Sequence, residues 1–144
     1  MNTIKQRNMV FLIAKNHVCL QLLINDWVPY DASVEGGPDV LAVRGEDIIR
    51  LKVRYSVLGS GGYVFSSGGR QDKTFYQLSE GNDFLILLCL GERREPAGFY
   101  LFPVKKAPKS KTFFHPEAGP YPKYREFFGS WRALDGSSGK KGVG

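Results

Sequence analysis

Apolar side chains near the amino terminus follow the spacing of a helix. Between residues 9 and 26 they recur every three or four positions, as at Ala14, Val18 and Leu22, which is the periodicity of one helix face. We expect one long helix there. Because its apolar content is broad, this helix should be buried over much of its circumference against a sheet. Residues 28–30 should then be extended, since their proline disfavours helical conformation in the residue before it.

A switch to two-residue periodicity over residues 36–56 predicts a β-hairpin. Strands are expected at residues 39–43 and 48–55, joined by an Arg-Gly-Glu-Asp turn at residues 44–47. Because successive side chains of a strand point to opposite faces, the second strand has one apolar and one basic face. The apolar face carries Ile49, Leu51 and Val53, and the other face carries Ile48, Arg50, Lys52 and Arg54.

Further strands are expected in the middle of the chain. Residues 84–90 form a continuous apolar run bounded by turn residues, which is typical of a central strand buried on both faces. Residues 98–104 would form its partner strand beyond a charged loop. A short strand at residues 63–65 precedes a glycine-rich connection at residues 66–70. Since no Gly-Lys-Ser/Thr follows these glycines, a phosphate-binding loop is not indicated.

The carboxyl-terminal third mixes lysines with aromatic residues. Residues 105–111 hold four lysines, which favours equally a mobile arm that grips phosphates and a solvated linker. Residues 113–116 are expected to be loop, and residues 123–134 a last helix that docks its aromatic side chains. Together the elements predict a single α/β domain at residues 1–134, with a mixed central β-sheet flanked by helices, and a flexible tail at residues 135–144.

Size and composition are those of an ordinary globular domain, with 144 residues of which 42% are hydrophobic and 24% charged. The net charge of +6 favours a polyanionic partner. Cys19 and Cys89 both lie within apolar runs, which indicates buried thiols in a reducing compartment. No apolar run has the length of a membrane span, so we expect a cytoplasmic protein without a membrane partner. His17 and His115 lack partners at zinc-ligand spacing.

The hairpin carries a pattern found in a known family of nucleases. Pro38-Asp39 on its first strand and Lys52 on its second, after a helix and a short strand, resemble the core of the PD-(D/E)XK superfamily. In that family the aspartate and a second acid, two residues before the lysine, hold a divalent metal beside the scissile phosphate. The resemblance implies a restriction-endonuclease-like fold over about residues 15–104, an Mg²⁺ cofactor, and catalytic roles for Asp39 and Lys52.

The sequence departs from the family pattern at two positions. Arg50 stands where the second acid belongs, and Lys15 stands where the helix of many relatives carries a glutamate. Arginine cannot ligate a metal, and its positive charge repels one. Asp39 would therefore hold the metal by itself, unless Glu35 or Glu46 joins it from a neighbouring loop.

These departures predict a protein that binds nucleic acid, DNA in preference to RNA, with hydrolysis reduced or absent. Without a metal, cationic side chains would contact phosphate oxygens directly, and arginine would do so in bidentate fashion. Three other interpretations stay open: a basic strand face that is simply solvated, an active Mg²⁺-dependent endonuclease, and a protein-interaction scaffold on the same fold. The expected phosphate-binding residues are Lys15, Arg50, Lys52, Arg54 and Arg70.

Overall fold

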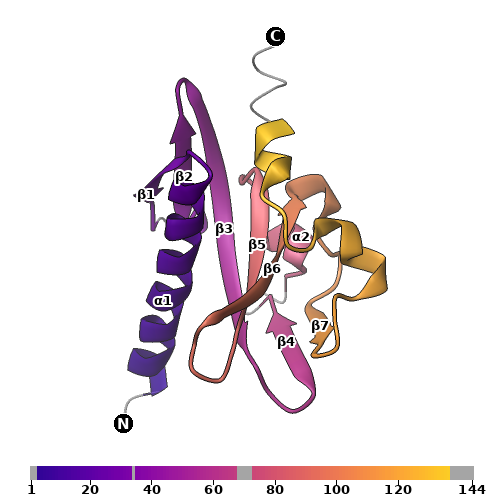
Figure 1. Ribbon diagram of the computed structural model, residues 1–144. Helices are drawn as coiled ribbons and strands as arrows, with labels where there is room; N and C mark the ends of the chain where they lie inside the picture. The colour runs from indigo at the N-terminus through magenta and orange to yellow at the C-terminus, as the bar shows by residue number, and fades with distance from the viewer. Residues whose placement is uncertain (1–2, 34, 68–72, 137–144) are drawn as a thin grey trace.

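The computed structural model describes residues 3–33, 35–67 and 73–136, with the backbone alone for residues 3–7. The chain forms a five-stranded sheet, and Figure 1 shows the long helix α1 (Thr3–Ile24) against one face of it. A two-stranded sheet and shorter helices cover part of the other face. This is the predicted α/β architecture, a mixed central sheet flanked by helices. No helix of the described residues is long and apolar enough to cross a membrane.

Helix α1 begins at Thr3 rather than at residue 9, because the polar segment before the apolar pattern contains no proline or glycine. The helix ends in a Schellman motif. The Trp27 N–H donates to the Leu22 carbonyl over 2.9 Å, and the Asp26 N–H donates to the Leu23 carbonyl over 3.1 Å. Asp26 has a positive φ of 68°. The chain therefore reverses there and Trp27 enters the core.

The central sheet has the strand order β1-β2-β3-β5-β6. Strands β3 and β5 are parallel and the other neighbours are antiparallel, so the sheet is mixed. All of β5 is buried, which confirms the expected strand covered on both faces. However, β3 rather than β5 holds the middle position. The strands are β1 (Val28–Asp31), β2 (Val40–Arg44), β3 (Asp47–Val57), β5 (Phe84–Leu90) and β6 (Pro96–Pro103).

A second, smaller layer packs on the face of the sheet away from α1. It contains the antiparallel pair β4 (Gly62–Ser66) and β7 (Thr112–Pro116), the helix α2 (Phe75–Leu78), and the 3-10 helices η1 (Val104–Lys106) and η2 (Pro122–Phe127). The expected loop at residues 113–116 is wrong, since these residues form β7.

Strand β7 alternates as a half-buried strand should. Phe113 and His115 are buried, whereas Phe114 between them is exposed. The pairing with β4 also requires a glycine at position 62. A Cβ atom on Gly62 would lie 2.5 Å from the His115 carbonyl oxygen. The strand depends on this close approach of two backbones, which the local sequence of β7 does not reveal.

The lysine-rich segment after β6 is tethered to the short helix α2. The Phe75 N–H donates to the Ser110 carbonyl and the Tyr76 N–H donates to the Pro108 carbonyl, each over 2.9 Å. Ala107 is buried between these contacts and η1. Of the two interpretations of this segment, a connecting linker fits its backbone hydrogen bonds better than a mobile arm.

The predicted last helix is interrupted. The 3-10 helix η2 ends at Phe127, Gly129 has a φ of 79°, and a short helical segment covers residues 132–136. Glycine tolerates this left-handed conformation, which breaks a continuous helix. Asp135, expected in the tail, pairs with Arg44 over 2.7 Å. The rest of that tail, residues 137–144, lies outside the described residues.

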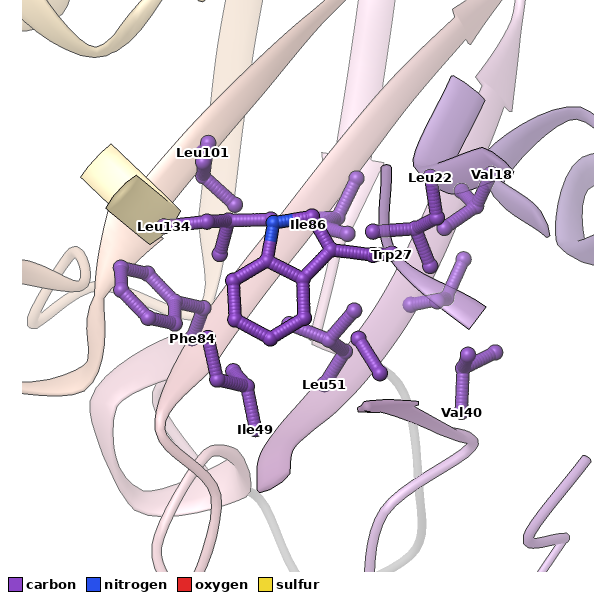
Figure 2. Close-up of a cluster of buried hydrophobic side chains, with 12 residues drawn as sticks. Val18, Leu22, Trp27, Val40, Ile49, Leu51, Phe84, Ile86, Leu101 and Leu134 are labelled. Carbon is purple, nitrogen blue, oxygen red and sulfur yellow. The ribbon is translucent and has the colours of Figure 1, made fainter. Parts of the chain in front are cut away.

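The core between α1 and the sheet is organised around Trp27, whose indole lies in the centre of Figure 2. Leu22 and Val18 reach it from α1, and Leu134 reaches the same cluster from the carboxyl-terminal end of the described chain. The predicted apolar face of β3 supplies its sheet side. Its residues Ile49, Leu51 and Val53 are all buried in this cluster. The other face of β3 is thereby directed toward the second layer.

Candidate nucleic-acid interface

Asp39 lies directly before β2, on the face of the sheet opposite α1. Its N–H donates to the Leu51 carbonyl over 2.9 Å. The β2–β3 register begins at the pair Val40–Leu51, and the Asp39 carboxylate lies near the Lys52 and Arg54 side chains of β3. Val40 is buried on the helix side, whereas the Asp39 carboxylate contacts Arg54, which lies on the opposite face of β3 from Val53. The structure thus places these two predicted residues side by side, at the edge of the second layer.

The Asp39 carboxylate is held by strand β3. Its Oδ2 accepts a hydrogen bond of 2.8 Å from the buried Val53 N–H and lies 3.7 Å from Nη1 of Arg54. The residue is 8% exposed. The carboxylate is therefore held between a buried amide donor and a guanidinium.

Lys52 is buried beside this carboxylate, with an exposed fraction of 5%. Its Nζ donates to the Gly37 carbonyl over 2.9 Å. Burial lowers the pKa of Lys52, the Asp39 charge opposes that effect, and the charges of Arg54 and Lys73 add to it. The ammonium group thus lies within the field of two other cations.

Arg54 completes the pair of cations next to Asp39. It is partly exposed, and its Nη1 also donates to the Val53 carbonyl over 2.8 Å. Burial lowers the pKa of Arg54, and the nearby Asp39 opposes this. Since guanidinium has five N–H donors, these contacts leave donors that can bind an anion at the surface.

Lys73 is a member of this cluster that the sequence did not single out. It is exposed, and its carbonyl accepts a hydrogen bond from the Ser67 hydroxyl. Its charge acts on Lys52, although 21 residues separate the two in the chain. No local sequence pattern marks this lysine as part of the site.

Arg50 is turned to a different partner. Its backbone N–H donates to Oδ2 of Asp83 over 2.7 Å, and its Nη2 lies 3.3 Å from Oδ1 of the same carboxylate. The resemblance implied that Arg50 and Lys52 flank Asp39. In the structure the flanking pair is Lys52 and Arg54, two residues further along β3. Arg50 stays exposed on the same strand face.

The remaining predicted residues are placed elsewhere. Lys15 is buried on α1 and donates to Asp31 Oδ1 over 2.6 Å and to the Ser33 hydroxyl over 2.8 Å. Its partner Asp31 is paired with Val40, whose side chain is on the helix side of the sheet. Lys15 is thereby separated from Asp39 by the sheet. Glu35 lies in an exposed turn. Arg70 falls outside the described residues.

The neighbours of Asp39 do not fit a divalent cation. Mg²⁺ binds through oxygen ligands, commonly one or two carboxylates with water and substrate phosphate. Here one carboxylate oxygen already accepts from an amide, and Lys52 and Arg54 adjoin it. Within the described part of the chain, no three histidine, cysteine or acidic side chains gather closely enough to hold a metal ion.

A solved structure with a similar fold is that of a bacterial homing endonuclease, I-Ssp6803I. The two share 17% sequence identity with a TM-score of 0.69, and the match covers 92% of this chain and 94% of that one. This chain has an endonuclease-like fold. No protein-family model and no curated protein sequence matches it.

Within the endonuclease-like fold, the cluster of Asp39, Lys52, Arg54 and Lys73 carries three cations and one carboxylate. Since the carboxylate is already engaged by Val53 and Arg54, the cluster presents net positive charge at the surface. Such a site attracts anions, and phosphate oxygens match both the ammonium and the guanidinium donors.

Proposed function

We propose that this chain binds nucleic acid, DNA in preference to RNA, and descends from PD-(D/E)XK nucleases whose metal-dependent centre it has lost. The observation that carries the proposal is that Lys52 and Arg54 lie beside the single carboxylate of Asp39, with Lys73 near enough for its charge to act on Lys52. The resemblance of Pro38-Asp39 and Lys52 to that superfamily, and a fold shared with a protein named as an endonuclease, support a nucleic-acid ligand.

The physical basis of binding is direct contact with phosphate. Arg54 and Lys73 are accessible at the rim of the cluster and would pair with backbone oxygens. Lys52 lies deeper and adds long-range attraction. Arg50 extends the same strand face, although Asp83 already neutralises part of its charge. The net charge of +6 favours approach to a polyanion of any sequence.

The basis for lost hydrolysis is the charge around Asp39. A metal at this carboxylate would sit beside two cations, which repel it, and would compete with the Val53 N–H for the same oxygen. Arg50 occupies the position of the missing second acid and binds Asp83. The centre therefore binds the phosphate with its own cations and lacks the ion that would activate water.

Binding is tested by titrating labelled duplex DNA with the wild type, Arg54→Ala and Lys73→Ala at several salt concentrations. Each substitution should weaken binding to all sequences alike and reduce the slope of log affinity against log salt by roughly 0.9 for each phosphate that the variant no longer binds. Arg93→Ala is the matched control, because it removes one charge from the exposed β5–β6 turn beyond the far end of β5. Equal effects from all three variants would overturn the assignment to this cluster.

Hydrolysis is tested by incubating supercoiled plasmid with the protein in Mg²⁺ and in Mn²⁺. We expect the plasmid to remain intact. Cleavage that is abolished by Asp39→Asn would show a functional metal centre and would refute the proposal that this centre has been lost. Competition between duplex DNA and duplex RNA of the same sequence tests the ligand, and preference for RNA would contradict that part of the proposal.

A further inference from the structure

A cavity of about 300 Å³ opens beside strand β7 and the 3-10 helix η2. It is lined by the aromatic residues Phe114, Tyr121 and Tyr124, the hydroxyl residue Thr112 and the cationic residue Lys123. No acidic residue is among the described residues of its wall. Its volume is at the lower end of the range for small-ligand pockets. A single planar ring system fits such a space better than a large molecule does.

Two aromatic residues of this cavity are open to solvent. Phe114 is 47% exposed and Tyr121 is 42% exposed, whereas the neighbouring Phe113 is buried. The Tyr121 ring is nevertheless held in place. Its centroid lies 5.9 Å from that of Phe113 and 5.8 Å from that of Tyr124, and the Tyr121 N–H donates to the Tyr100 hydroxyl over 3.1 Å. Tyr121 is therefore a supported ring with exposed area on which another ring can stack.

Lysines are placed around the same cavity. Lys123 is exposed, and its Nζ lies 5.5 Å from the centroid of the Tyr124 ring. Lys109 is exposed next to Ser110, which also lines the cavity, and its Nζ lies 5.5 Å from the centroid of the Tyr76 ring. The cavity thus joins aromatic rings to positive charge. That combination suits a ligand with flat apolar faces and an attached anionic group.

Hydrogen bonds connect the wall of this cavity to the cluster of cations around Asp39. The Ser67 hydroxyl donates to the Lys73 carbonyl, and the Ser67 N–H donates to the Lys111 carbonyl over 2.9 Å. Thr112, the next residue, lines the cavity. Lys73 is close enough to Lys52 for its charge to act there. The cavity therefore adjoins the proposed phosphate-binding cluster.

We propose that this cavity binds an unpaired base of the nucleic acid whose phosphates lie on that cluster. The inference rests on the proposed function and adds a second contact to it. Each base has two flat faces that stack on aromatic rings, and a neighbouring phosphate that lysine can bind. A base inside a duplex is already stacked and paired, so the ligand must carry a gap, an overhang or a bulge. An acidic peptide would match the lysines but would leave the exposed rings without a stacking partner.

The experiment compares the affinity of the full chain for intact duplex DNA, for a duplex with a central gap that leaves bases unpaired, and for the same gap with abasic nucleotides. The two gapped ligands carry equal charge, and the one with bases should bind about five- to hundredfold more tightly. Tyr121→Ala should remove most of this preference and Tyr121→Phe should keep it, because the ring stacks. Arg54→Ala should weaken binding to all three ligands by one factor. Leu12→Ala is the control, since Leu12 is exposed on α1 across the sheet, and circular dichroism checks folding.

The outcomes separate this inference from the proposed function. If duplex DNA binds but the gaps with and without bases bind equally, the base-binding cavity is refuted and the proposed function stands. If none of the three ligands binds, the proposed function fails and the inference fails with it. A loss of preference in Leu12→Ala equal to that in Tyr121→Ala would refute the assignment to the cavity. A 5-iodouracil in the gap should cross-link on irradiation to residues 112–124, and cross-links confined to other segments would also overturn that assignment.

Discussion

Replacing Asp39 by alanine should destabilise this protein. The substitution removes a charged acceptor from the buried Val53 N–H, which it binds over 2.8 Å, and such a bond contributes about 1.5–3 kcal/mol. The partly exposed pair with Arg54 at 3.7 Å adds up to about 1 kcal/mol. We therefore expect Asp39→Ala to lower the free energy of unfolding by about 2–4 kcal/mol. Asp39→Asn keeps an oxygen acceptor and should cost about half as much.

The sign of this change in the free energy of unfolding distinguishes a carboxylate surrounded by cations from one in a metal centre of several carboxylates. In a metal centre built from several carboxylates, removing one relieves repulsion between like charges. Around Asp39 the neighbours are cations, so removal should leave Lys52 and Arg54 facing each other unscreened. Urea unfolding of the wild type and both variants, with and without Mg²⁺, measures the difference. A more stable Asp39→Ala variant, or a wild-type midpoint that rises with Mg²⁺ only while Asp39 is present, would refute this reasoning.

Three further predictions concern stability. Leu22→Ala should cost about 2–5 kcal/mol because Leu22 is fully buried, whereas Leu23→Ala on the exposed face should change the urea midpoint little in dilute protein. Burial holds the pKa of His115 below its usual 6.5. The unfolded chain therefore binds this proton at a higher pH than the folded chain does. The free energy of unfolding should fall as the pH is lowered below about 6.5, and it should fall less in His115→Phe. Gly62→Ala should lower the melting temperature, because its Cβ would collide with the His115 carbonyl, while Gly36→Ala meets no atom within 4 Å and tests backbone strain alone.

The candidate site shows how much of its geometry the local sequence pattern can predict. Two-residue alternation placed Lys52 and Arg54 on one face of β3 and the apolar residues on the other, as the structure has them. The pattern could not tell which of the cations faces Asp39. That depends on where β2 begins against β3, because the Asp39 carboxylate accepts from the Val53 N–H, and on Asp83, which lies 33 residues from Arg50 and binds it.

The sequence by itself determined those elements in which apolar positions recur every few residues. These are the long helix, the hairpin and the buried strand β5, because burial of one or both faces imposes its period directly on the chain. The tertiary structure alone decided what depends on distant segments. Strand β7 exists because Gly62 lets β4 approach it, Lys73 reaches the cluster through the segment before α2, and Lys15 is separated from Asp39 by the sheet. Such pairings depend on where separate segments meet in space, and no short stretch of residues records that.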